Sequence, residues 1–471
     1  MSERSFSLSR RRVLVGIACS PAIASSAASA SLPISLRPED FGAAGDGRRD
    51  DSSAFRRLAQ ALNDTGGGTL VMRAGAIYRV GIAVPGTYPP PPLLELRDCR
   101  APIVIEGNNA VMRGPAGALF GTFDNAGKKL HPAMPYYGAP AIRVPYRYMI
   151  LIERCASVTI RNLELDGMIG SARIGGQYGD TGWQIAMMGL KLVDNRGPEL
   201  ISSVYSHHHG LDGVMIDGPN VSSTSRVLQN VRCEYNGRQG CSVVGGTGYQ
   251  FIGCTFAKTG RSAVVSAPSA GVDIEAEGTK RVSGLRFSNC RFIDNAGVGL
   301  LADQGPSHDV VVTDSLLVGT TSWAAWPRKP GFRFQRCKFV GAIVNAYGSD
   351  NPREAAQFVD CTFTDDPALA PGGRVYGRDG SVPMVDLGGS LGGGRNVAFV
   401  RTKFTFTQGK LPWTVGSIFE DVTMIQSTRA VSFPRGIYRG NNILRGSIDT
   451  NPSSIEGTVD FNGKIVGPSR F

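Results

Sequence analysis

The chain has 471 residues, of which 61 are glycines and only 19% are charged. A chain of this length usually forms two or three domains, but the glycine content and the few helix-like stretches favour one long β-rich body of repeats. The net charge of +11 suits an acidic partner, and the sequence contains no nucleic-acid-binding motif.

Residues 1–30 are predicted to be a twin-arginine export signal. Residues 9–14 (SRRRVL) carry the paired arginines, a short apolar run follows, and residues 28–30 (ASA) supply a small-residue cleavage site. The apolar run is too short and too broken to span a bilayer, so a periplasmic or secreted protein is expected. Without this segment the net charge falls to +8, because the segment holds four arginines and one glutamate.

Residues 39–80 are predicted to begin the fold. The sequence DFGAAGDG at residues 40–47 precedes Asp51 and Ser52, which can cap a helix whose apolar residues recur at helical spacing. Three glycines at residues 66–68 end that helix, and two strands joined by a turn follow. This segment resembles the N-terminal signature of the pectate-lyase superfamily. The resemblance implies an all-β protein, a right-handed parallel β-helix whose N-terminal end is capped by the short helix.

A repeat is visible without that resemblance. Similar triplets begin at Cys233, Cys254, Cys290, Cys337 and Cys361, with Ser315 filling a gap, and the spacings are 21, 36, 25, 22 and 24 residues. A period in the low twenties is one turn of a solenoid, and the longer spacing marks an inserted loop. We therefore predict that the five cysteines stack as buried thiols inside the solenoid and do not form disulfides.

Residues 31–471 are predicted to form a single β-helix domain with long loops over residues 113–148 and 167–190. Such loops usually gather on one side of a solenoid and form the walls of a groove. Tyr178 and Trp183 are candidates for stacking on a sugar ring, although packing of the loop onto the body is an equally good interpretation. The period loosens over residues 365–471, where we expect irregular coils and a cover for the last strand edges.

The candidate site spans residues 207–277. Alignment of three segments on Gly210, Gly240 and Gly271 places Asp212, Ser242 and Asp273 at equivalent positions. In the third segment Asp273, Glu275 and Glu277 alternate with apolar residues, so three carboxylates share one strand face. Like charges repel there, which favours a bound cation or a catalytic role over an exposed polar face.

Two catalytic interpretations follow. In a lyase acting on a uronate-containing polysaccharide, Asp273, Glu275 and Glu277 would hold Ca²⁺, and Arg238, or else Lys258 or Arg261, would act as base or charge clamp. In a glycoside hydrolase, Asp212 would pair with Asp273 or Glu275. The segment beginning at Asp212 resembles one in polygalacturonases, but Gln239 and Gly240 stand where that family has two aspartates.

Two further functions remain open, a non-catalytic glycan-binding β-helix and an alginate epimerase, although no Tyr/His/Asp cluster of epimerase type occurs in one short motif. His207 and His209 would share a face near Asp212, which favours proton transfer or sugar contact. Zinc is disfavoured because no other Cys/His cluster has zinc-like spacing. Of these functions the lyase is preferred, and the sequence does not distinguish a monomer from a trimer. The predicted substrate-binding residues are His207, His209, Gln239, Trp183, Tyr178, Lys258 and Arg261.

Overall fold

The computed structural model describes residues 34–81, 90–124, 126–129, 142–143, 145–175, 184–221, 223–428, 431–432, 434–446, 448–449 and 454–470. The predicted export signal, Tyr178 and Trp183 lie outside these ranges. Residues Pro33–Phe471 form one compact unit. In the described part of this unit nearly all regular structure is β, and the α-helix is α1, Ser52–Asp64.

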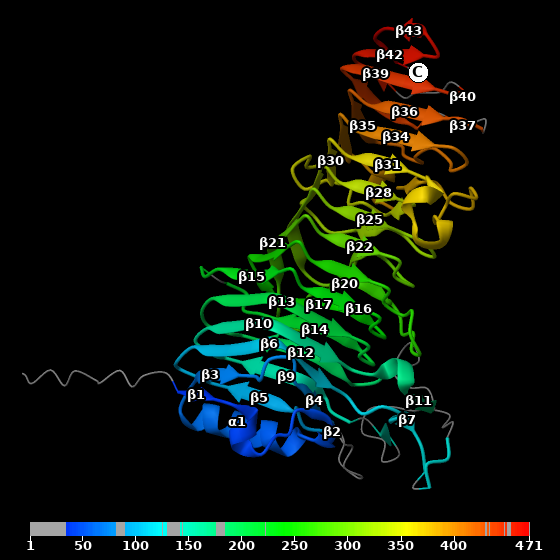
Figure 1. Ribbon diagram of the computed structural model, residues 1–471. Coiled ribbons are helices and arrows are strands. Elements are labelled where there is room, and N and C mark those ends of the chain that lie inside the picture. Colours follow the sequence, from blue (N-terminus) through cyan, green and yellow to red (C-terminus); the bar gives the residue numbers. More distant parts are fainter. Residues whose placement is uncertain are drawn as a thin grey trace, which may run out of the picture. The chain divides into compact units, whose positions relative to one another are not determined.

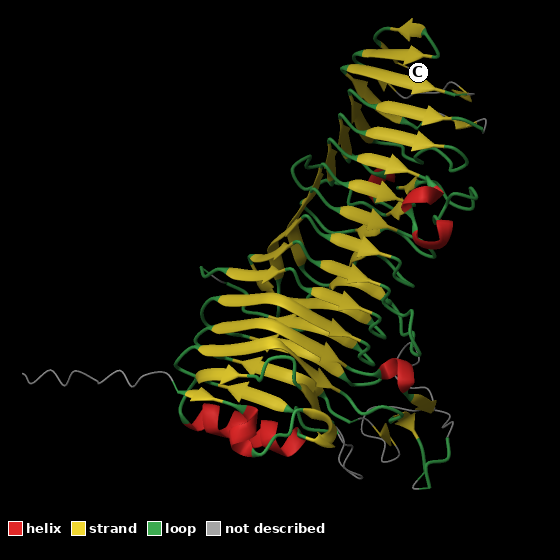
Figure 2. Ribbon diagram, viewed as in Figure 1, coloured by secondary structure: helices red, strands yellow, loops and turns green. Residues whose placement is uncertain are grey.

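The strands of the stacked coils pair in parallel along three faces, called here the first, second and third sheets, and the longest strands join these faces into one 39-stranded sheet (Figures 1 and 2). The first sheet begins with β1 (Ser35–Leu36) and β3 (Gly68–Val71) and continues through the first halves of β6 (Ile103–Arg113), β10 (Val158–Asp166) and β13 (Glu199–His207). It is completed by β15 (Arg226–Gln229), β18 (Tyr249–Ile252), β21 (Val282–Ser288), β24 (Ser307–Thr313), β27 (Phe332–Gln335), β30 (Gln357–Val359), β33 (Ala398–Val400), β35 (Ser417–Glu420), β38 (Gly436–Arg439) and β41 (Ser454–Ile455).

The second sheet starts at β2 (Asp46–Asp50) and β4 (Ile77–Arg79) and takes in the second halves of β6, β10 and β13. It continues through β16 (Arg232–Glu234), β19 (Thr255–Ala257), β22 (Arg291–Ile293), β25 (Leu316–Val318), β28 (Lys338–Val340), β31 (Thr362–Thr364), β34 (Lys403–Phe406), β36 (Thr423–Gln426), β39 (Asn441–Arg445) and β42 (Thr458–Phe461).

The third sheet carries the candidate site. It consists of β5 (Leu94–Arg97), β9 (Tyr148–Glu153), β12 (Met188–Val193), β14 (Asp212–Asp217), β17 (Gln239–Thr247), β20 (Ala270–Ile274), β23 (Leu300–Ala302), β26 (Ala325–Pro327), β29 (Ile343–Val344) and β32 (Val385–Asp386). Two small sheets lie apart from these three, β7 (Leu119–Thr122) with β8 (Ile142–Arg143) and β11 (Arg173–Gly175), and β37 (Val431–Ser432) with β40 (Ile448–Asp449). The predicted parallel β-helix is confirmed.

Alternation of side chains explains why these short segments are strands. In β10, Val158 and Ile160 are buried, whereas Arg161 is exposed. Successive residues of a strand point to opposite faces, and stacking places Ile160 between Ile105 and Ile201 of the adjacent coils. Each coil therefore buries its apolar residues against the coils before and after it.

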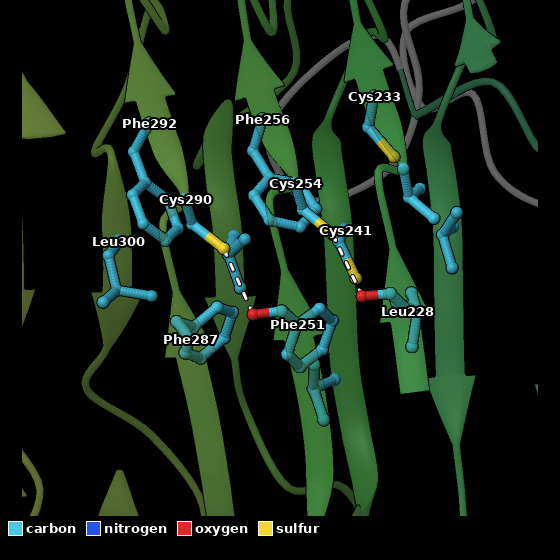
Figure 3. Packing of buried hydrophobic residues seen from close by; sticks show 14 of the residues in the cluster. Leu228, Cys233, Cys241, Phe251, Cys254, Phe256, Phe287, Cys290, Phe292 and Leu300 are labelled. Atoms are coloured by element: carbon cyan, nitrogen blue, oxygen red, sulfur yellow. Dashed lines mark hydrogen bonds between the residues drawn. The ribbon is translucent and has the colours of Figure 1, made fainter. Parts of the chain in front are cut away.

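A column of small polarizable side chains lines the corner between the first and second sheets. Cys254, Cys290, Cys337 and Cys361 occupy it in successive coils, with Ser315 between the second and third. Each of the four thiols donates to a carbonyl oxygen of an earlier coil at 3.3–3.5 Å, as Figure 3 shows for Cys254 and Cys290. All eight described cysteines are buried free thiols.

The predicted membership of Cys233 in that column is wrong. Cys233 lies opposite Phe256 in the register of β16 with β19, so it occupies an aromatic position on the second sheet. Val231 fills the corner, because its carbonyl accepts from the backbone N–H of Thr255. The triplet that begins at Cys233 looks like the others, but it lies two residues later in its coil than they do in theirs, because Val231 is the residue equivalent to Cys254.

Aromatic stacks fill the interior of the later coils. Phe334, Phe358, Phe399, Phe419 and Tyr438 follow one another along the first sheet, with neighbouring ring centroids 5.0–5.4 Å apart. Figure 3 shows the start of a similar arrangement, in which the rings of Phe251 and Phe287 stack at 4.4 Å. Offset-stacked rings add stabilisation beyond the apolar area they bury.

Both ends of the coil stack are covered. At the N-terminal end α1 buries Phe55, Leu58 and Leu62, and Asn63 bonds to the backbone of β5 at the Glu95 carbonyl and the Arg97 N–H. At the C-terminal end, β43 (Lys464–Val466) and β44 (Ser469–Arg470) pair antiparallel with β42 and β41. Within the described ranges, no helix has the length and apolar character to cross a membrane.

Candidate active site

Three consecutive strands of the third sheet, β14, β17 and β20, carry the acidic segments predicted from the sequence. Ser242 of β17 lies opposite Asp273 of β20, as predicted, and opposite Met215 of β14. Asp212 lies opposite Gln239 and is therefore three residues away from the predicted position. The predicted equivalence of Asp212 with Ser242 and Asp273 is wrong.

Close approach between coils sets this register. A Cβ atom on Gly213 would lie 2.8 Å from the carbonyl oxygen of Gly240, and one on Gly240 would lie 2.5 Å from that of Gly271. These distances are too short for any side chain, so glycine is required in this column. Gly210, the residue used in the sequence alignment, instead packs against the side chain of Ile185.

Two buried carboxyl groups flank β17. The Ser242 hydroxyl donates to Oδ2 of Asp212 at 2.8 Å, and Nε2 of Gln239 donates to Oδ2 of Asp273 at 2.7 Å. Asp212 is 0% exposed and Asp273 is 4% exposed. One strand therefore holds an acid of the coil before it and an acid of the coil after it.

Burial gives the two acids different proton affinities. Desolvation raises the pKa of Asp273 to about 8, and the nearby charge of Glu275 raises it further while Arg238 opposes the rise. Desolvation likewise raises the pKa of Asp212 to about 6, against the charge of Arg238 and the hydrogen bond from Ser242. At neutral pH, Asp273 therefore retains its proton and Asp212 is mainly ionised.

The predicted calcium triad is not assembled. Strand β20 ends at Ile274. The backbone N–H groups of Glu275 and Glu277 donate to the adjacent carbonyls of Val243 and Val244, so the regular register is lost between the two glutamates. Among the described residues, the Asp/Glu/His/Cys side chains whose ligand atoms lie within 4.8 Å of one another are Asp166, His207 and His208. Asp273, Glu275 and Glu277 therefore do not form a group whose carboxylate oxygens lie within that distance of one another.

Aromatic residues that the sequence reasoning missed extend the outer side of the same sheet. The position of Asp273 is continued by Leu301 in the next coil and by Trp326 in the coil after it. Trp326 and Trp323 are partly buried and pack against the cluster formed by Ala270, Val298 and Leu301. The sequence does hold a signal for Trp326. If the period of the solenoid is continued from Asp273 through residues 298–326, Trp326 falls on the same outer side of the third sheet.

His209 points into the interior. Its Nε2 lies 3.2 Å from the Leu165 carbonyl oxygen and its Nδ1 lies 3.1 Å from the Tyr146 hydroxyl. Asn236 makes the equivalent contact from the next coil, with Nδ2 donating to the Ser206 carbonyl. Complete burial lowers the pKa of His209 well below its ordinary value, so the ring is neutral. The ring therefore stabilises the turn between the second and third sheets and is not placed to contact a substrate.

His207 belongs to a network on the second sheet. Its Nδ1 lies 2.6 Å from Nδ1 of His208, and its Nε2 lies 3.3 Å from the carboxylate of Glu164. Asp166 completes a group of metal-binding type, but Arg113 already donates to its carboxylate at 3.0 Å. The predicted histidine pair is therefore split, with His207 on the second sheet and His209 inside the coil.

Lys258 and Arg261 are likewise held away from the two buried acids. The Lys258 ammonium donates to the Tyr235 hydroxyl at 2.8 Å. Arg261 pairs with Asp294 at 3.2 Å and donates to Thr320 at 3.0 Å, which fixes the inserted loop. Of the predicted site residues, the structure brings together Asp212, Arg238, Gln239, Asp273 and Glu275.

No protein-family model and no curated protein matches this chain. Among solved structures, the A-module of a mannuronan C-5 epimerase from Azotobacter vinelandii is 17% identical, with 88% of this chain and 98% of that chain covered and a TM-score of 0.45. A tailspike capsular polysaccharide depolymerase of Acinetobacter baumannii bacteriophage Fri1 is 12% identical, with 89% and 64% covered and a TM-score of 0.39. The Streptococcus pneumoniae adhesin PfbA is 12% identical, with 91% and 100% covered and a TM-score of 0.39. These similarities concern the fold alone.

Proposed function

We propose that this protein is an enzyme that cleaves an acidic polysaccharide by β-elimination at the third sheet, with Asp273 as general acid. The observation that carries the proposal is the raised pKa of Asp273, about 8, at a position 4% exposed on the outer side of the sheet. A carboxylic acid that keeps its proton at neutral pH can protonate the leaving glycosidic oxygen.

The neighbouring residues fit the other requirements of the reaction. Elimination removes the C5 proton of a uronate, breaks the bond from C4 to the glycosidic oxygen, and transfers a proton to that oxygen. Glu275, two residues after Asp273, is the base in this proposal, and the Arg238 guanidinium neutralises the substrate carboxylate. Asp212 is fully buried and bonded to Ser242, so we assign it a positioning role beside Arg238.

The test is turnover of uronic-acid polysaccharides, followed both by the ultraviolet absorbance of the unsaturated product and by the appearance of reducing ends. We expect both signals, and we expect a chelator to leave them unchanged. Asp273→Asn should lower kcat by about 10²–10⁴-fold, the usual contribution of a general acid, because asparagine keeps an acceptor for Gln239 but has no acidic proton to transfer to the leaving oxygen. Asp314→Asn, an exposed carboxylate at another corner, is the matched control.

The two signals separate the alternatives. Reducing ends without the absorbance would replace elimination by hydrolysis, with the same acid and with Glu275 activating water. Full activity of Asp273→Asn would exclude Asp273 as the acid. Absence of both signals on every uronate polymer, with the protein folded, would overturn the proposed function.

A further inference from the structure

A cavity of 950 Å³ lies along the edge where the third sheet turns into the first. Residues 278–281, 305–309, 328–331 and Arg333 contribute to it from three successive coils, and Tyr347, Arg353 and Glu354 contribute from a fourth. Six cationic side chains line it, against two carboxylates, and the six are Lys280, Arg281, Arg328, Lys329, Arg333 and Arg353.

The two carboxylates of the cavity already have partners. Asp309 pairs with Arg286 at 3.2 Å, and Glu354 accepts hydrogen bonds from Ser349 and Asn351 at 3.0 and 3.1 Å. Of the cations, Lys280 pairs with Asp217 at 3.2 Å and also with Asp194. These ion pairs leave the cavity strongly positive.

The other five cations form no ion pair with a carboxylate in the part of the chain that the structure describes. Arg281, Arg328 and Arg353 are exposed. In Arg333, Nη2 donates to the Arg353 carbonyl at 2.7 Å, while Nη1 is buried and makes no hydrogen bond to described atoms. Clustered like charges are costly unless anions neutralise them, and a buried guanidinium donor needs an acceptor.

The arrangement suits a polymer better than a single small anion. Adjacent coils lie about 4.8 Å apart, so four coils present positive charge over about 14 Å of the axis. A chain with regularly spaced carboxylates can pair with several of these cations at once, and Tyr347 in the wall offers an aromatic face to a sugar ring. The loop 278–281, which lines the cavity, directly follows Glu275 and Glu277 in the sequence, so the cavity begins next to the acidic end of the candidate active site.

We propose that this cavity is a non-catalytic binding site for an extended stretch of acidic polysaccharide. That the polymer is a uronate chain rests on the proposed function, whereas binding of a polyanion rests on the cavity alone. The site holds the substrate beside the reacting residues and increases its residence on the enzyme.

The test is binding of polygalacturonate and alginate to the folded protein carrying Asp273→Asn, which prevents turnover, at low and at physiological salt. Adding Arg328→Gln and Lys329→Gln should weaken binding about ten-fold or more and reduce its salt dependence, as expected for loss of two charge-assisted contacts. The matched control replaces Arg291 and Lys403 by glutamine, exposed cations of the second sheet that remove the same charge. Arg353→Gln tests the far wall independently.

Each outcome decides one proposal. Equal loss of binding in the cavity and control variants, or no loss in either, would overturn the cavity site and leave the proposed function standing. Cavity-dependent binding of polyphosphate or single-stranded nucleic acid without binding of any uronate polymer would overturn the glycan ligand. Cavity-dependent uronate binding together with no cleavage by the parent protein would keep this site and reject the proposed function.

Discussion

Asp273 links the charge state of the candidate site to the stability of the fold. In the folded protein its pKa is raised to about 8, whereas in an unfolded chain an aspartate titrates near its ordinary value of about 3.9. Between these values the folded protein binds a proton that the unfolded chain has released. The contribution of Asp273 to stability is therefore complete below about pH 4 and is lost as the pH rises through about 8.

We predict that Asp273→Asn flattens the pH dependence of unfolding. The free energy of unfolding of the parent protein should fall, relative to the variant, by up to about 1.4 kcal/mol per pH unit in this window. Asparagine mimics the protonated acid and keeps the acceptor for Gln239, so the variant should be the more stable of the two at pH 8. Denaturant unfolding at pH 5, 6, 7 and 8 measures the difference.

The control for this measurement is Asp64→Asn, an exposed carboxylate at the end of α1. This variant removes the same charge at the surface and measures the effect of net charge alone. Parallel curves for the parent protein and Asp273→Asn would mean that Asp273 is ionised in the folded state, and its role as general acid would be excluded. Asp212, whose own pKa is raised to about 6, is present in both proteins, and its charge is one of the causes that raise the pKa of Asp273.

At the scale of the element, the corner between the second and third sheets is a ladder of side chains that bond to backbone groups. Asn236 accepts from the backbone N–H of His209 at 3.0 Å and donates to the Ser206 carbonyl. Asn295 likewise accepts from the backbone N–H of Thr259 and donates to the Phe256 carbonyl. His209 continues this ladder, with Nε2 in place of the amide nitrogen. The ladder satisfies buried polar groups that the turn would otherwise leave unpaired.

This ladder predicts that His209→Asn is tolerated much better than His209→Ala. Asparagine has the right donor for the Leu165 carbonyl and loses only the contact with Tyr146, whereas alanine leaves that carbonyl and the Tyr146 hydroxyl unsatisfied and opens a cavity, at a cost of about 2–4 kcal/mol. Thermal unfolding and turnover of both variants check this. If both variants stay folded and both lose activity, His209 takes part in the reaction, contrary to its place in the ladder.

The repeat could be predicted from the sequence because strand alternation and the turn period are local patterns. The register of the site could not be predicted from the sequence. Gly210 and Gly213 look equivalent there, and only the neighbouring coil shows that Gly213 is the one that lies against a carbonyl oxygen. The basic cavity could not be predicted for a related reason. Its cations extend from Lys280 to Arg353, which lies 73 residues later in the sequence, and they come together only when four coils stack. Charges distributed in this way leave no motif.

At the scale of the whole molecule, a parallel coil stack has two open ends, and both need a cover. The sequence predicted α1 at the first end. The cover at the other end is the antiparallel pairing of β43 with β42 and of β44 with β41. Antiparallel return strands of two or three residues present short edges, and short edges resist pairing with other chains.

Removal of residues 463–471 should therefore leave the coils folded but make the protein self-associate. The deletion exposes the backbone groups of β41 and β42, which form a template for strand pairing between chains, while the earlier coils contact only their own neighbours and keep their stability. Light scattering coupled to size exclusion should show a mass that rises with protein concentration. Replacing Lys464 and Arg470 by glutamine removes the same two cationic side chains but retains the strands, and this variant should keep the mass of the parent protein. Association of the glutamine variant would assign the effect to charge, and a deletion that keeps the parent mass would show that these strands do not protect the edge.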